Sequence, residues 1–358
     1  MVRAPLSRKP RAARQPKGKS LSGLTSLALR QTERAALGTL KSRLVKPRTE
    51  LVYRRSCEWF FALCASMEIF YDMPIVEFDD LVGEAIEFAW ESGEGRNVVG
   101  NLLSGLEHFV PALKGRLRYS WRLWRVWGDS EVPCRAPPLS ARATMAICYY
   151  LWQWGFPRTA LVTMLAFATF LRTMEFVGMR KVQLSFSTKQ QVVHIQLPHT
   201  KGASRRGGTE GVTLDDPTLV LSLRRALADA LPGDCCMEAN CRQYRILFNA
   251  ACAAVGLSDS FKPYSLRRGG ASSHFRRFAS WSNTMDVGRW ADIRTAKTYI
   301  NTALLDLTAM SCFETDVILR ASESFLAILA RYADSTTWKQ KWLLATFRHP
   351  PDSCDARV

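Results

Sequence analysis

The sequence predicts a mostly α-helical protein with one small antiparallel β-sheet, an α+β fold in two domains. Three observations lead to this prediction. The length of 358 residues exceeds that of one ordinary domain. Apolar residues recur at helical spacing through most of the chain, whereas only three short runs have the alternation and turn residues of strands. Hydrophobic residues make up 47% of the chain, enough for real cores.

The first segment, residues 1–48, has the composition of a disordered basic arm. It holds thirteen lysines and arginines against one acidic residue, Glu33, and so carries most of the chain's net charge of +17. A segment so rich in Pro, Gly, Ser and Ala cannot bury enough apolar surface to fold. The charge favours a polyanionic partner. The arm itself fits nucleic-acid contact, nuclear targeting or a solvated tail with no specific role.

Residues 50–130 are predicted to form a helical bundle. Its last helix, over residues 117–127, has a basic stripe, because Arg118, Arg122 and Arg125 are four and three residues apart and share one side. Such a stripe fits a helix that lies along DNA, and it also fits an ordinary solvated face. Before it, helices are predicted around residues 59–70, 78–90 and 98–113.

Three prolines, Pro133, Pro137 and Pro138, mark residues 131–138 as a linker. The second domain is predicted to cover residues 139–333. It has expected helices at 140–154, 158–178 and from 217 onward, and strands at 182–186, 192–197 and 211–214. Residues 334–358 are expected to be a loosely ordered tail.

Several residues of the second domain fit the cleavage of a phosphodiester without a metal. Such a reaction needs fixed guanidinium groups on the phosphate, a nucleophile in line and an acid for the leaving oxygen. Arg172 ends an apolar helix, and Glu175, three residues on, can pair with and orient it. Lys201 lies in a turn after a predicted strand, and Trp290 precedes Tyr299 by nine positions.

The run Tyr264-Ser265-Leu266-Arg267-Arg268-Gly269-Gly270 opens a predicted helix. Ser265 is a predicted N-cap of this helix. Gly269 and Gly270 are poor helix formers, and a close approach of the backbone to DNA would explain their presence.

Taken in order, these residues resemble the pattern of the tyrosine recombinase (phage integrase-like) family over about residues 138–303. That pattern is Arg, a hairpin Lys, His-x-x-Arg, His or Trp, and a nucleophilic Tyr. The matching residues are Arg172, Lys201, Arg267, Trp290 and Tyr299. The helical bundle before them resembles the family's DNA core-binding domain. The run from Leu266 to Ala271 is similar to recombinases of eukaryotic mobile elements.

The resemblance implies a DNA recombinase or integrase that breaks and rejoins DNA. Tyr299 would form a 3′-phosphotyrosyl link and free a 5′-hydroxyl, while Arg172 and Arg267 hold the non-bridging oxygens. Lys201 would protonate the leaving oxygen. Trp290 would donate its indole N–H or pack behind the site. Because the covalent link conserves the bond energy, neither metal nor another cofactor is expected.

One position departs from the family pattern, since Tyr264 stands where the family usually has His. A phenol can donate a hydrogen bond but is a poor proton acceptor at neutral pH. Three alternatives therefore stay open: a recombinase-derived DNA-binding protein that has lost catalysis, a type IB topoisomerase-like enzyme, and a basic helical scaffold.

Double-stranded DNA is the expected partner, with contacts from Arg118, Arg122, Arg125, Arg205, Arg206 and Arg268. The resemblance also implies a tetramer on DNA, in which a helix over about residues 315–332 docks on a neighbouring protomer. The alternative is that this helix packs on its own domain. No apolar run is long enough to cross a membrane, and ten cysteines without a secretory signal fit an intracellular protein. The basic arm suggests a nuclear address.

Overall fold

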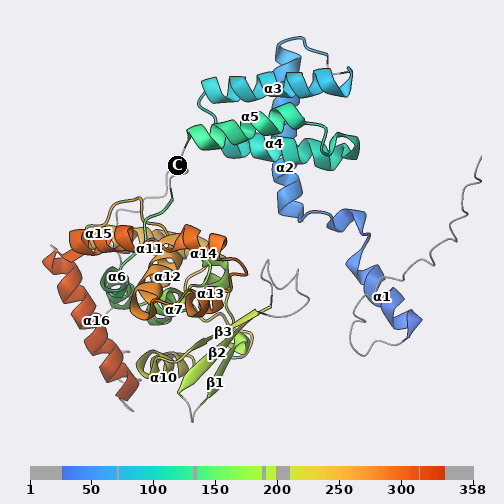
Figure 1. Ribbon diagram of the computed structural model, residues 1–358. Coiled ribbons are helices and arrows are strands. Elements are labelled where there is room, and N and C mark those ends of the chain that lie inside the picture. Colours follow the sequence, from blue (N-terminus) through green and yellow to red (C-terminus); the bar gives the residue numbers. More distant parts are fainter. Residues whose placement is uncertain are drawn as a thin grey trace, which may run out of the picture. The chain divides into compact units, whose positions relative to one another are not determined.

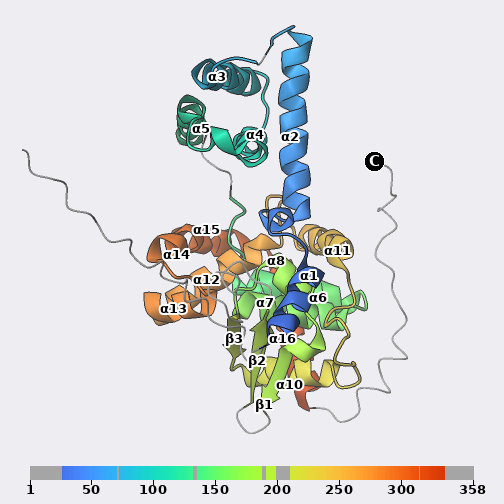
Figure 2. The same cartoon turned by 90° about the vertical axis from the view of Figure 1, so that its right-hand side faces the viewer.

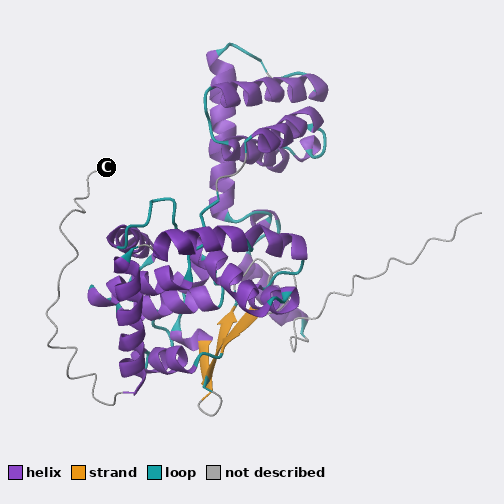
Figure 3. Ribbon diagram, turned by 60° about the vertical axis from the view of Figure 1, so that its left-hand side comes forward, coloured by secondary structure: helices purple, strands orange, loops and turns teal. Residues whose placement is uncertain are grey.

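A computed structural model describes residues 26–70, 72–131, 135–187, 191–198, 210–313 and 315–334. The chain divides into two compact units, Met1–Pro133 and Cys134–Val358, and each is described by itself. Helices make up most of both units, and the strands form one small sheet in the second (Figure 3). The predicted α+β fold is therefore confirmed.

The N-terminal unit is helical throughout its described part (Figures 1 and 2). Its helices are α1 (Leu27–Leu37), α2 (Pro47–Ser66), α3 (Ile75–Glu91), α4 (Arg96–Phe109) and α5 (Arg118–Ser130), with 3₁₀ turns at Lys41–Arg43 and Pro111–Leu113. In the bundle, α2 packs against α4, and α3 packs against α5. Fully buried Phe60, Val82 and Leu102 lie in the core that these four helices enclose.

The start of α5 is fixed by a side chain from another helix. The carboxylate of Asp79 on α3 accepts hydrogen bonds from the backbone N–H groups of Tyr119 and Ser120, at 2.8 and 3.0 Å. The hydroxyl of Ser120 adds a third bond to this carboxylate at 2.6 Å. Because first-turn N–H groups have no partner within their own helix, this capping sets where α5 and its arginines lie.

Part of the segment expected to be disordered is helical. Helix α1 spans Leu27–Leu37, where Ser26 accepts a hydrogen bond from Leu29 N–H as N-cap, and α2 already begins at Pro47. Leu, Ala, Arg and Gln are good helix formers, so local propensity prevails here over the basic composition. The expected disorder is wrong for α1 and the start of α2, and residues 1–25 lie outside the described residues.

The C-terminal unit is a helical assembly with the sheet on one side (Figure 1). Its helices are α6 (Ala141–Gln153), α7 (Pro157–Ala168), α8 (Thr173–Val177), α10 (Pro217–Ala226), α11 (Cys241–Ala254), α12 (Tyr264–Phe278), α13 (Trp281–Gly288), α14 (Ile293–Tyr299), α15 (Thr302–Phe313) and α16 (Asp316–Asp334), with a 3₁₀ turn at Lys181–Gln183. The strands are β1 (Leu184–Ser187), β2 (Val192–Leu197) and β3 (Glu210–Leu214).

The sheet has the order β1-β2-β3 with both pairs antiparallel. Leu184 pairs with Ile195, and Val193 pairs with Leu214. Val193, Ile195 and Leu197 of β2 are buried, whereas His194 and Gln196 between them are exposed. This alternation places one face of the sheet on the core and confirms the period-two pattern in the sequence.

Helix α12 crosses the centre of this unit and lies very close to the backbone of α7 and of the segment before α6. A Cβ on Gly269 would lie 2.0 Å from the carbonyl oxygen of Leu139, and one on Gly270 would lie 2.0 Å from that of Phe167. These glycines are therefore required by packing against α7 and the segment before α6, and not by an approach to DNA. Nor is Ser265 the N-cap, since α12 follows Pro263 and Ser265 lies in its first turn.

Helix α16 covers its own unit. Ile318, Phe325 and Leu329 are buried in the same core as α6, and the ring of Trp152 meets those of Phe325 and Tyr332 edge-on, at centroid distances of 6.4 and 5.2 Å. Packing on its own domain is one of the two arrangements that the sequence leaves open for this helix, and Val317 and Leu326 on it are exposed. Among the described residues, no helix is long and apolar enough to cross a membrane.

Candidate active site

The turn between α7 and α8 positions Arg172. Phe170 adopts a left-handed backbone conformation with φ of 50°, which a residue other than glycine seldom adopts, and is fully buried. Arg172 follows as the N-cap of α8. Its Nη1 donates to Glu175 Oε1 at 2.6 Å, and its backbone N–H donates to Oε2 at 2.8 Å. Burial alone would lower the pKa of Arg172, but the hydrogen bond and charge of Glu175 raise it, so the group stays a cation.

Arg267 on α12 is fully buried beneath the site. Its Nη1 donates to the carbonyl of Phe170 and its Nη2 to that of Gly288 at 2.9 Å. The guanidinium carbon lies 5.0 Å from the ring centres of both Trp290 and Tyr299. Burial, together with the charges of two other arginines, lowers the pKa of Arg267 to about 10, which still leaves it charged at neutral pH.

Tyr299 is the last residue of α14 and stacks on Trp290, with ring centres 4.8 Å apart and planes inclined by 26°. Trp290 in turn stacks on Phe170. The indole N–H of Trp290 is buried and has no hydrogen-bond partner among the described residues. Trp290 therefore packs behind the tyrosine, which is one of the two roles that the sequence suggests for it.

Tyr264, the residue that departs from the family pattern, touches the expected nucleophile. Its hydroxyl donates to the hydroxyl oxygen of Tyr299 at 2.7 Å, and 39% of the residue is exposed. Burial, followed by the hydrogen bond and charge of Tyr299, raises the pKa of Tyr264. The phenol is therefore protonated at neutral pH and acts there as a donor toward Tyr299.

A third arginine, Arg289, belongs to this site and is missed by the sequence pattern. Its side chain is 4% exposed, and its Nη2 donates to Glu175 Oε2 at 2.7 Å. Its Nε lies 3.7 Å from Oε2 of Glu210, the first residue of β3. The only signal in the sequence is its position between Gly288 and Trp290. Arg172 and Arg289 pair with the two carboxylates, and Arg267 donates only to backbone carbonyls, so the three guanidinium groups leave one net positive charge for an anion such as a phosphate.

The remaining predicted residues have different fates. Lys201, Arg205 and Arg206 lie outside the described residues. Arg268 is 6% exposed and donates to the carbonyl of Ala136 at 2.5 Å, so the structure does not place it where it would contact DNA. The reason is that the middle of α12 is buried inside its unit, which places this arginine against the segment before α6.

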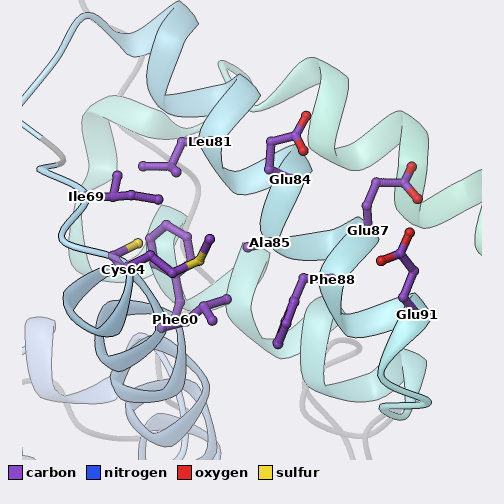
Figure 4. Close-up of a pocket in the computed structure, with 11 residues that line it drawn as sticks. Phe60, Cys64, Ile69, Leu81, Glu84, Ala85, Glu87, Phe88 and Glu91 are labelled. Carbon is purple, nitrogen blue, oxygen red and sulfur yellow. The ribbon is translucent and has the colours of Figure 1, made fainter.

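The arginines of α5 are exposed as the sequence suggests. Arg118, Arg122 and Arg125 face solvent, whereas Trp121 and Trp124 pack against the bundle core. Elsewhere in this unit a groove of about 260 Å³ lies between α2 and α3 (Figure 4). Apolar side chains such as Leu81 line it, and Glu84, Glu87 and Glu91 lie along its rim. It contains none of the predicted site residues.

Comparison with known proteins identifies the fold. No family model matches the sequence, and no curated protein matches it either. Among solved structures, the Tn1549 transposon integrase in complex with transposon right end DNA is 14% identical, with a TM-score of 0.54 over 84% of this chain and 98% of that one. The same integrase with circular intermediate DNA is 15% identical, with a TM-score of 0.51 over 80% and 98%. A lambda integrase dimer bound to a core site is 14% identical, with a TM-score of 0.52 over 76% of each chain.

These likenesses show the fold, which this chain shares with integrases over most of its length.

Proposed function

We propose that this protein, which has the tyrosine recombinase fold, is a DNA strand-transferase that breaks and rejoins DNA through Tyr299. The observation that carries the proposal is the placement of the Tyr299 hydroxyl. This hydroxyl accepts a hydrogen bond from Tyr264. The ring of Tyr299 lies on the guanidinium of Arg267, and the cation of Arg172 is near enough to act on Tyr299 electrostatically. Fixed cations and a hydrogen-bond donor beside a hydroxyl stabilise the negative charge that develops on its oxygen as it attacks.

The reaction would begin with attack of the Tyr299 oxygen on a DNA phosphate. The new bond is a 3′-phosphotyrosyl ester, the bond to the 5′-oxygen breaks, and the phenol proton of Tyr299 passes to solvent, because Tyr264 cannot take it up at neutral pH. Arg172, whose side chain is 36% exposed, is the guanidinium that can reach the non-bridging oxygens directly. Arg267 is buried and stabilises negative charge on the Tyr299 ring and oxygen from behind. The scheme requires no metal ion.

The leaving 5′-oxygen needs a proton, and Lys201 is the proposed donor. In the sequence, Lys201 lies between Pro198, which follows β2, and Glu210, the first residue of β3, whose carboxylate approaches Arg289. Support for the assignment is that Arg289 contacts both Glu210 and Glu175, so β3 begins beside the site.

DNA is the proposed substrate and partner. The neighbours of known structure are described as bound to DNA, and the exposed arginines of α5 offer contacts to a phosphate backbone. A lambda integrase of similar fold binds its core site as a dimer. We therefore propose that several copies of this chain assemble on DNA. Nuclear location stays a prediction from the basic arm.

A covalent capture experiment with a library of DNA duplexes tests the function, because it requires no single target sequence to be chosen. The full chain is incubated in a metal chelator with duplexes that carry a randomised segment and a nick within it, so that a cut releases a short strand and prevents rejoining. DNA that stays attached to protein in denaturant is recovered and sequenced. Wild-type protein should yield enriched sequences, and Tyr299→Phe should yield none while it still binds the recovered DNA.

The second candidate is a recombinase-derived protein that binds DNA without cutting it. Tyr264 in place of His favours it, because the phenol cannot take up the proton of Tyr299 at neutral pH. Equal, salt-dependent binding by both proteins with no covalent DNA in either would decide for this candidate. A topoisomerase-like enzyme would instead give the adduct and also relax supercoiled plasmid by itself.

A further inference from the structure

Glu175 holds two arginines at once. Its Oε1 accepts from Arg172, whereas its Oε2 accepts from both Arg289 at 2.7 Å and the backbone N–H of Arg172 at 2.8 Å. A carboxylate with four lone-pair positions can serve all three donors, but its orientation is then set by all of them together. The position of the Arg172 guanidinium therefore depends on how firmly Arg289 holds the other oxygen of Glu175.

Arg289 is built into the site more firmly than a surface charge would be. Its backbone is left-handed, with φ of 57°, at the C-terminus of α13, and its side chain is 4% exposed. Its Nε and Nη1 have no hydrogen-bond partner among the described residues, and neither does Oε2 of Glu210. Burial lowers the pKa of Arg289, while the charge of Glu175 opposes this. A buried cation with unmet donors is costly, so a functional reason for it is worth seeking.

We propose that Arg289 is a positioning residue, which holds Glu175 so that Arg172 stays free to turn its guanidinium toward the scissile phosphate. This inference rests on the proposed function. Without Arg289, both carboxylate oxygens of Glu175 would be available to Arg172 in a two-pronged pair, which draws its donors away from DNA. Glu210 supplies the second countercharge for Arg289 and connects the same network to the first residue of β3.

Arg289→Met is the main test, with the duplex recovered by covalent capture as substrate. Misplacing a catalytic group by about 1 Å can slow a reaction about 100-fold, so we expect adduct formation to slow by about 10-fold to 100-fold. DNA affinity should change by less than about threefold, because Arg289 is not at the surface. Arg158→Met is the matched control, since it removes a side-chain Arg–Glu contact of the same unit, to Glu238, and no hydrogen bond or ion pair links that pair to the site among the described residues.

A double-mutant cycle separates positioning from simple support of the fold. Arg172→Lys keeps a charge and a measurable rate but lacks the planar fork that needs orienting. If Arg289 acts through Arg172, the double variant should cut within about twofold of Arg172→Lys alone. If the two effects multiply instead, Arg289 does not act through Arg172 and the inference is overturned.

Folding is controlled by a further variant, Arg289→Met with Glu210→Gln. Arg289→Met alone leaves the Glu210 carboxylate buried without its cation, and the second change removes that carboxylate. The double variant should therefore be thermally more stable than Arg289→Met alone, while its cleavage stays slow. Recovery of both stability and cleavage would show that Arg289 only supports the fold. Absence of any adduct from wild-type protein would overturn the proposed function itself. An active wild-type protein in which the effects of Arg289→Met and Arg172→Lys multiply would overturn only the role of Arg289.

Discussion

The two units use arginine in opposite ways. In the N-terminal unit, Arg118, Arg122 and Arg125 lie exposed along α5, and no ion pair to them occurs among the described residues. In the C-terminal unit, Arg267, Arg268 and Arg289 are buried and donate to backbone carbonyls or to Glu175. The exposed arginines of α5 can adapt their side chains to a polyanion, whereas the buried arginines of the C-terminal unit are held in one geometry by their hydrogen bonds.

Under the proposed function, this difference separates DNA binding from the chemistry of cleavage. Exposed arginines release counterions when they meet phosphates, and their contribution falls steeply with salt. Buried guanidinium groups act in surroundings of low dielectric, where fixed charges have their largest effect on a transition state and salt screens them little. Substitutions in α5 should therefore change affinity and its salt dependence, and substitutions in the site should change rate and stability.

The largest effect is expected for Arg267→Met. It leaves the carbonyls of Phe170 and Gly288 without their donor inside the unit and removes the cation beneath Tyr299. We expect the free energy of unfolding of the C-terminal unit to fall by about 3 kcal/mol and adduct formation to slow by about 100-fold to 1,000-fold. Urea unfolding followed by circular dichroism, and single-turnover cleavage at a temperature where the variant is folded, measure the two.

The matched control is Arg122→Met, the same change on α5, which should alter stability by no more than about 0.5 kcal/mol. If Arg267→Met were as stable as this control, the buried guanidinium would not hold the α7–α8 turn and α13 together, and the contrast between the units would fail.

A smaller effect, on the cleavage rate and its dependence on pH, is expected for Tyr264→His. Because its pKa is raised, Tyr264 stays protonated through neutral pH, where it donates to the Tyr299 oxygen but cannot accept its proton. Wild-type cleavage should therefore rise with pH toward the alkaline range. An imidazole with an ordinary pKa of about 6.5 can accept the proton, so the variant should gain up to about tenfold at pH 7.

The measurement for Tyr264→His is the single-turnover rate from pH 6 to 9. Tyr264→Phe, which can neither donate nor accept, serves as the comparison and should be slower than wild type at every pH. Parallel profiles for all three proteins would mean that residue 264 does not take part in proton transfer.

The fold and the outline of the site follow from the sequence because they depend on periodicity and order along the chain. The strand positions and the helix that carries Arg267 agree with local patterns. The helix expected over residues 158–178 is wrong in its middle, because α7 ends at Ala168 and α8 begins at Thr173, with Arg172 as its N-cap. The contact of Tyr299 with Trp290 is one that the resemblance implies. Arg289 could not be recognised in this way. Its partners, Glu175 and Glu210, are far away in sequence, and a single arginine between Gly288 and Trp290 carries no periodic signal.

Two wrong predictions have the same physical origin. The sequence assigns Gly269 and Gly270 to a close approach to DNA, and Arg268 to a DNA contact, because a helix rich in Gly and Arg looks like a polar surface element. In the structure α12 is the central helix of its unit, so each of these residues meets protein backbone. Composition gives the polarity of a helix, but only the tertiary fold decides what surrounds it.

The smallest effect concerns α5 and is resolved by salt dependence. Arg122→Gln should reduce the slope of log affinity against log salt concentration by about one if the residue contacts a phosphate. Cleavage at saturating protein should be unchanged. Binding is measured by fluorescence anisotropy at several salt concentrations, with the captured duplex and an unrelated duplex, and both should be affected alike because a phosphate contact reads no sequence.

Glu87→Gln changes the charge of the same unit by one, at the rim of the groove between α2 and α3 (Figure 4). If only the overall charge mattered, this variant would strengthen binding as much as Arg122→Gln weakens it. If α5 is the surface that meets DNA, Glu87→Gln should leave the salt slope as it is, because no counterion is released or retained at that site. Equal and opposite changes would show that the α5 arginines attract DNA from a distance without touching it, and that direct contact must be sought on another face of the unit.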